Sequence, residues 1–193
     1  MENNKQSLEQ KLEFITQVIK EAKSQYEENG FIYMLWGILI AITSISQYIL
    51  LINEYYSIHY YPFFIIPLGT IYTIYYYSRK EKMKHNIITR IVSYTWLFIS
   101  LNLIVLGFLF AATLKVNLSP IMLIILSIGM ILSGISIRSR LIIGSGIIIN
   151  ITGYILFKLD WIYHPLVVGI VSLITFVIPG ILLMLKYKKS KKC

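Results

Sequence analysis

Four side chains in two polar connections are the first candidates for chemistry. Glu54 and His59 follow the first long apolar run of the sequence, and Asp160 and His164 precede the last one. Carboxylates and imidazoles are accepted zinc ligands by type. Their spacing matches no closed metal-binding motif, so we expect neither a metal ion nor another cofactor here.

The apolar runs themselves contain no acidic, basic or histidine side chain. Asp, Glu, Lys, Arg and His are absent from all six runs, which cover residues 31–52, 61–77, 91–114, 120–137, 141–157 and 165–185. Ionisable residues within a membrane mark proton relays, ion pathways and many catalytic sites. A serine in these runs would also lack a His or Lys to activate it as a nucleophile. The sequence therefore predicts that the protein is not an enzyme.

Neutral polar residues do occur within the runs. Asn102 and Asn150 each lie near the middle of a run, and Gln47 ends a short polar band in the first run. Burying an amide without a hydrogen-bond partner costs about 2–7 kcal/mol, so these side chains should form a polar core that faces protein. Hydrogen bonding between helices is one role for them, and contact with a substrate is the other.

Proline and small residues predict the shape of the helices. Pro67 and Pro179 lie inside apolar runs, where each should kink its helix and free a carbonyl group. Runs four and five are rich in residues that permit close backbone approach, namely Gly129, Ser133, Gly134, Ser136, Gly144, Ser145, Gly146 and Gly153. The connection between these two runs is only three residues long, which predicts antiparallel neighbours.

The elements that carry these residues follow from composition and run length. The chain has 193 residues, of which 56% are hydrophobic and 14% are charged, whereas soluble domains average about 25% charged. Each run has 17–24 residues, and a helix needs roughly 20 to cross a bilayer. We predict an all-α membrane protein with six transmembrane helices in three hairpins, preceded by a cytoplasmic amphipathic helix. The predicted regions are 1–30, 31–185 and a basic tail at 186–193.

The distribution of positive charge predicts the orientation. Sixteen of the 18 Lys and Arg residues lie on the side of the membrane that holds both termini, and only Lys115 and Lys158 lie on the other. The excess of positive charge marks the cytoplasmic side. The net charge of +9 is therefore explained by topology and by contact with the lipid bilayer, and we expect no nucleic-acid partner.

The first 30 residues predict a helix with one apolar stripe. Its residues recur at helical spacing, as Leu8, Leu12, Ile15, Ile19 and Tyr26 show. Six Glu and four Lys residues make this segment acidic, which is unsuited to an anionic membrane surface. Three roles are open: packing across the inner ends of the bundle, pairing with a second copy, and docking of a cytoplasmic protein.

Several short patterns along the chain resemble an uncharacterised family of small bacterial six-span integral membrane proteins. They include Trp36 and Gly37, Tyr61 and Pro62, Ser119 and Pro120, Ser133 and Gly134, and the run Ile178, Pro179 and Gly180. The resemblance implies a multi-pass protein of the bacterial cytoplasmic membrane with both termini in the cytoplasm. It assigns no activity, ligand or active site.

Two functional hypotheses follow. The first is a non-enzymatic membrane protein that acts as a sensor or accessory component with a cytoplasmic partner. The alternative is a small-molecule transporter or channel subunit that works as a homo-oligomer, with Asn102, Asn150, Pro67 and Pro179 along its pathway. The acidic helix favours the first hypothesis, and the neutral polar residues favour the second.

Overall fold

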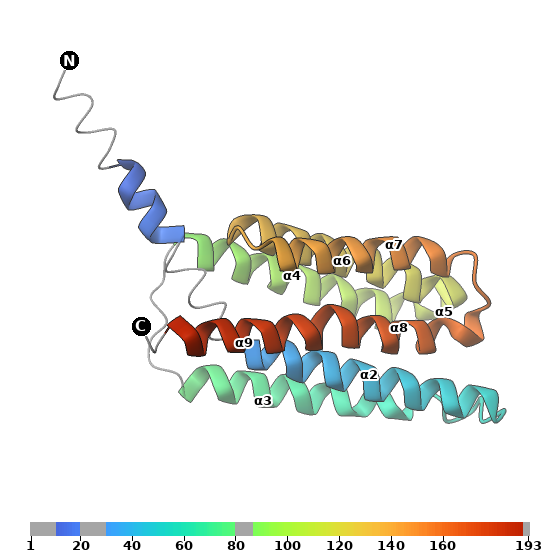
Figure 1. Ribbon diagram of the computed structural model, residues 1–193. Coiled ribbons are helices and arrows are strands. Elements are labelled where there is room, and N and C mark those ends of the chain that lie inside the picture. Colours follow the sequence, from blue (N-terminus) through green and yellow to red (C-terminus); the bar gives the residue numbers. More distant parts are fainter. Residues whose placement is uncertain (1–10, 20–29, 80–86, 191–193) are drawn as a thin grey trace, which may run out of the picture.

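The computed structural model describes residues 11–19, 30–79 and 87–190, and the regular elements in these ranges are all helical (Figure 1). Residues 11–19 form a short helix. The α-helices that follow are α2 (Gly30–Ile52), α3 (Ile65–Arg79), α4 (Ile87–Leu109), α5 (Ala111–Leu114), α6 (Leu118–Ser136), α7 (Arg140–Leu156), α8 (His164–Ser172) and α9 (Ile178–Ser190). Short 3-10 turns lie at η1 (Tyr61–Phe64), η2 (Lys115–Asn117) and η3 (Trp161–Tyr163), and η4 (Leu173–Val177) is a π-helical segment. The predicted all-helical class is confirmed for this part of the chain.

Four helical segments are long and apolar enough to cross a membrane. They are Gly30–Ile52, Arg90–Leu109, Ala111–Ser136 and Trp161–Lys189. Helices α3 and α7 are shorter, with 15 and 17 residues, and they correspond to the predicted second and fifth spans. The long apolar helices indicate a membrane-embedded protein.

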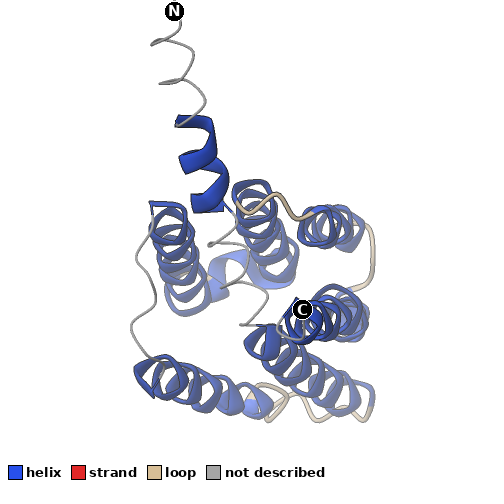
Figure 2. Ribbon diagram, turned by 60° about the vertical axis from the view of Figure 1, so that its left-hand side comes forward, coloured by secondary structure: helices blue, strands red, loops and turns tan. Residues whose placement is uncertain are grey.

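The helices lie side by side, and each packs on few neighbours (Figure 2). Helix α2 packs on α3 and on the segment formed by α8, η4 and α9, and this segment also packs on α7. Helix α7 makes the most extensive contact of the bundle with α6, and α6 in turn packs on α4. Helices α3 and α4 are thus the least covered members of the bundle.

The buried core lies where α6, α7, η4 and α9 meet. Its side chains are Leu123, Met130, Ile137, Ile142, Ile149, Leu156, Phe176 and Leu183. Small residues bring α6 and α7 together, because a methyl group added at Gly134 would lie 2.7 Å from the Ile143 nitrogen. Gly146 likewise lies against Ile131 and Gly153 against Ile124, so the two neighbouring helices run in opposite directions.

The third apolar run ends earlier than its composition suggests. The prediction placed one helix over residues 91–114, but α4 ends at Leu109 and Phe110 separates it from the one-turn helix α5. Lys115 then has a positive φ of 47°, which helps the chain to reverse toward α6. Apolar side chains continue through this turn, so hydropathy alone does not mark it.

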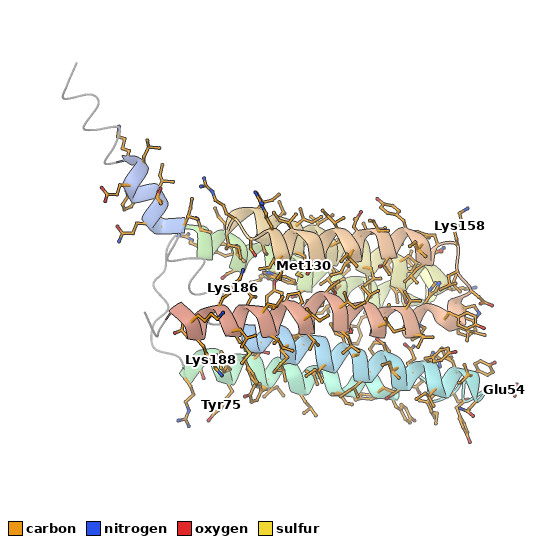
Figure 3. The ribbon with its side chains drawn as sticks, viewed as in Figure 1. Glu54, Tyr75, Met130, Lys158, Lys186 and Lys188 are labelled. Atoms are coloured by element: carbon orange, nitrogen blue, oxygen red, sulfur yellow. The ribbon has the colours of Figure 1, made fainter. Side chains whose placement is uncertain are left out.

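The two ends of the bundle differ in the charged residues that they carry. Figure 3 shows Lys186 and Lys188 near the end where α2 begins and α9 finishes, and Glu54 and Lys158 near the opposite end. Helices α2 and α9 therefore run in opposite directions along the bundle.

Candidate functional site

The helix at residues 11–19 presents its apolar side chains to solvent. Leu12, Phe14 and Ile15 are 57%, 66% and 52% exposed, and Ile19 is half-buried. The Thr16 hydroxyl donates to the Leu12 carbonyl of the same helix at 2.8 Å. Figure 1 shows this helix extending away from the bundle. The expectation that its stripe packs across the inner ends of the bundle is therefore wrong for Leu12 and Ile15.

The described residues do not test the rest of the predicted stripe. Leu8 and Tyr26 lie outside the described residues. Within residues 11–19, however, Leu12, Ile15 and Ile19 share one side of the helix by their spacing of three and four residues. An exposed apolar side of this kind marks a surface that another protein or a membrane covers.

Asn150 on α7 forms a hydrogen bond to another helix, which is one of the two roles expected for it. Its side-chain nitrogen donates to the Ser127 hydroxyl oxygen of α6 at 2.8 Å. The Ser127 hydroxyl in turn donates to the Ile124 carbonyl at 2.6 Å, and Ser127 is fully buried. The Asn150 amide is thus bonded to α6 through the Ser127 hydroxyl, whose own hydrogen is also engaged in a hydrogen bond.

Asn102 on α4 is placed differently. Its side chain is exposed, and its nitrogen donates at 2.8 Å to the Phe98 carbonyl one turn earlier in the same helix. Within the ranges that the structure covers, Asn102 makes no hydrogen bond to another helix. The expectation that it faces protein inside the bundle is therefore wrong, because α4 turns this side outward while it packs Ile99 against Gly129 of α6.

The polar band of the first run lies on α2. Gln47 is half-buried, whereas Thr43 and Ser44 are buried. The Thr43 hydroxyl donates to the Leu39 carbonyl at 2.7 Å, which satisfies it within its own helix. The structure does not bring Gln47, Asn102 and Asn150 together: they lie on α2, α4 and α7, which are not mutual neighbours.

Pro67 does not kink the middle of a span. It is the third residue of α3, directly after the 3-10 turn η1. Donors in the first turn of an α-helix have no partner within that helix, so a proline fits there without breaking a hydrogen bond. The predicted kink is thus replaced by a change from 3-10 to α-helical geometry at the beginning of α3.

Pro179 has a larger local effect. It is the second residue of α9, one residue after the π-helical segment η4, and the Ile178 N–H between them donates to the carbonyl of Leu173, five residues earlier. A proline at 179 has no N–H for the Thr175 carbonyl, and Thr175 itself is fully buried. The irregularity predicted at Pro179 therefore takes the form of a widened turn, a feature that often lies at functional sites.

Three aromatic residues join helices in a way that the sequence did not indicate. The Tyr33 hydroxyl of α2 lies 3.4 Å from the Met130 sulfur of α6, and its ring stacks on Phe176 with centroids 5.8 Å apart. The indole nitrogen of Trp96 donates to the Ser133 hydroxyl at 3.1 Å. Trp36 donates likewise to Thr73 at 3.1 Å. Spacing could not reveal these pairs, since their members are far apart along the chain.

The connections at the end of the bundle that carries Glu54 and Lys158 meet through aromatic rings. The rings of Tyr56 and Trp161 lie 6.4 Å apart. The imidazole of His59 contacts the Tyr56 carbonyl at 2.6 Å, and that of His164 contacts the Leu159 carbonyl at 3.1 Å. Among residues 11–19, 30–79 and 87–190, no group of three or more His, Cys, Asp or Glu residues is placed to hold a metal ion.

Tyr60, at the same end of the bundle, has a pKa above its ordinary value. The neighbouring Tyr61 raises the pKa of Tyr60, first through the repulsion between their phenolate charges and then through their hydrogen bond. The two rings meet edge to face with centroids 4.9 Å apart. Both residues are about half exposed, as is typical of tyrosines at a membrane–water interface.

The chain matches no protein-family model, no curated protein and no solved structure. The resemblance to six-span membrane proteins therefore stays a prediction. The function has to be inferred from the exposed helix, the polar contacts and the helix packing of this chain alone.

Proposed function

We propose that this chain is a non-enzymatic protein of the bacterial cytoplasmic membrane that acts, as a sensor or accessory component, by binding a cytoplasmic protein through its amino-terminal amphipathic helix. The apolar side chains exposed on residues 11–19 are the observation that carries this proposal. The remainder of the chain anchors and orients that helix.

Six transmembrane passes in three hairpins are part of the proposal. Besides the four long apolar segments, η1 and α3 together give about 30 Å of helix, and α7 gives about 25 Å. Both lengths approach the hydrocarbon thickness of about 30 Å. With six passes, the amino-terminal helix and the basic tail lie on one side, which the excess of Lys and Arg identifies as cytoplasmic.

The charge of the amino-terminal segment favours a protein partner over the membrane surface. Six Glu and four Lys residues lie in residues 1–30, so anionic lipid head groups would repel it on balance. Amphipathic helices that lie on such membranes carry basic polar faces instead. We infer a partner with an apolar groove and a basic rim, the usual complement of an acidic amphipathic helix.

Photo-crosslinking in cells tests the proposed surface. Crosslinkers at positions 12 and 15 of the full chain should capture one discrete cytoplasmic protein, whereas crosslinkers at 13 and 17, on the opposite side of the helix, should not. The captured protein, once purified, should bind the full chain in lipid nanodiscs. Equal capture at all four positions would contradict the proposal.

A pair of matched double variants makes the binding test quantitative. Leu12→Ser with Ile15→Ser removes apolar contacts and should weaken binding at least about tenfold, since each buried side chain contributes about 1.5–3 kcal/mol. Glu13→Ser with Gln17→Ser introduces the same residue type on the other side and should leave affinity within about twofold. A loss of affinity that is equal for both pairs would reflect helix propensity rather than a docking surface.

Transport is less well supported by the geometry. Asn102 lies on the outside of α4 and Asn150 is engaged by Ser127, and the core at α6, α7, η4 and α9 is filled by Leu, Ile, Met and Phe side chains. We therefore expect no solute flux from proteoliposomes that contain the purified chain. Flux abolished by Asn150→Leu would favour the transporter instead.

A further inference from the structure

Asn102 is a polar side chain on a largely apolar exposed surface of α4, which also carries Ser93 and Ser100. It lies about midway along the apolar run 91–114, so it is placed within the hydrocarbon region. Its nitrogen bonds to the Phe98 carbonyl of its own helix, which uses only one of the two hydrogens that an amide can donate. The other hydrogen and the amide oxygen make no bond within the described chain, and lipid tails offer none.

The residues that share this side of α4 follow the spacing of a coiled-coil seam. Counting from Ile91, residues recur after four, three, four, three and four positions, as Ile91, Thr95, Phe98, Asn102, Val105 and Leu109. Ile91, Phe98 and Leu109 are 53%, 61% and 72% exposed. The seam runs over most of α4, and Asn102 takes a position at which a single asparagine specifies partner number and register.

We propose that α4 is the interface of a homodimer in the membrane, in which the Asn102 side chains of two copies bond to each other across a two-fold axis. An amide is self-complementary, because it offers both a donor and an acceptor. Two copies inserted in the same orientation place their α4 helices parallel, and only a parallel pair brings residue 102 of one copy opposite residue 102 of the other.

A second copy fits these observations better than a lipid does. Lipid tails match the apolar side chains of the seam, but they leave the amide unsatisfied. Thr95, the other polar residue of the seam, is already satisfied, since its hydroxyl donates to the Ile91 carbonyl at 3.0 Å. Asn102 is thus the polar residue of the seam whose amide still lacks hydrogen-bond partners within the described chain. It lies where the symmetry axis would cross the seam.

Energy transfer between labelled copies in liposomes tests the proposal with the full chain. The wild type should self-associate, and Asn102→Leu should weaken association about 5- to 30-fold, as expected for a hydrogen bond between membrane helices. Asn102→Gln keeps the amide and should associate within a few-fold of wild type. A wild type that stays monomeric at every protein-to-lipid ratio would overturn the proposal, and so would association that Asn102→Leu leaves unchanged.

Disulfide crosslinking locates the interface independently of Asn102. The chain contains a single cysteine, Cys193, so new cysteines can be introduced after Cys193→Ser. Phe98→Cys and Val105→Cys lie on the seam and should form crosslinked dimers. Leu101→Cys and Ile104→Cys lie away from it and should not; preferential crosslinking at 101 or 104 would overturn the assignment of the interface.

Discussion

Two asparagines lie near the middle of apolar helices in this protein, and their surroundings differ. Asn150 on α7 donates to Ser127 of α6, across the most extensive helix contact of the bundle. Asn102 on α4 is exposed and bonds only to the turn before it. The same side chain thus fastens two helices within the chain in one case and is left available on the surface in the other.

The difference follows from how the two helices are held. Between α6 and α7, Gly134 and Gly146 allow the backbones to approach, so a short side chain such as asparagine can reach across. Helix α4 contributes larger side chains to its contact with α6, such as Ile99, which packs against Gly129. Few of the side chains of α4 are buried. The close packing of α6 and α7 therefore lets the Asn150 amide bond to a neighbouring helix. Asn102 instead stays on the exposed side of α4, where a second copy can reach it.

The largest expected effect comes from separating α6 and α7. Gly134→Ala would place a methyl group 2.7 Å from the Ile143 nitrogen, and overpacking of this kind costs about 1–3 kcal/mol. The gain in helix propensity of up to about 1 kcal/mol offsets part of this loss. Unfolding in mixed micelles of detergent and lipid should show a net loss of about 1–2 kcal/mol.

Gly144 provides the control for that substitution. A methyl group added there meets nothing within 4 Å, so Gly144→Ala should keep or raise the unfolding free energy by up to about 1 kcal/mol. The two variants make the same chemical change in neighbouring helices. Equal effects at Gly134 and Gly144 would show that close approach of α6 and α7 does not hold the pair together.

A smaller effect should distinguish the two asparagines directly. Asn150→Leu removes the bond to Ser127 and should lower the unfolding free energy of the monomer by about 1 kcal/mol. Asn102→Leu should leave monomer stability within about 0.5 kcal/mol, because an exposed residue outside the core loses no contact between helices. Unfolding at high dilution in micelles measures both without interference from dimerisation.

Ser127→Ala assigns the loss to the proposed pair. If the bond between Asn150 and Ser127 carries the effect, the double variant should lose less than the sum of the two single variants, because the same contact is removed in each. Strict additivity would mean that Asn150 stabilises α7 in some other way. The comparison with Asn102 would then rest on exposure alone.

Sequence patterns were sufficient for much of this architecture. Run length and hydropathy located the helices, and the small residues around Gly134 and Gly146 identified α6 and α7 as close neighbours. These features are local, since each depends on residues within one or two turns of helix. The stripe of Leu12 and Ile15 was recognised for the same reason, although its packing was not.

The rotation of each membrane helix about its axis could not be predicted. A helix that is apolar on all sides has no amphipathic pattern to show which side faces protein, and Asn102 and Asn150 therefore look alike in sequence. The π-helical segment before Pro179 and the contact of Tyr33 with Met130 depend on neighbours far away along the chain. Such features are decided by tertiary packing rather than by local sequence.

The last expected effect concerns the attachment of α4 to α6. Trp96 donates to Ser133 of α6 at 3.1 Å, and Trp36 donates to Thr73 of α3 at 3.1 Å. Trp96→Phe keeps an aromatic ring but removes the donor, so it should lower the unfolding free energy by about 0.5–1.5 kcal/mol. Trp36→Phe, the matched change in the contact between α2 and α3, should cost about the same. If Trp96→Phe also strengthens self-association in liposomes, the bond from Trp96 to Ser133 restrains α4 from pairing with a second copy. If Trp36→Phe strengthens self-association equally, the effect is not specific to α4.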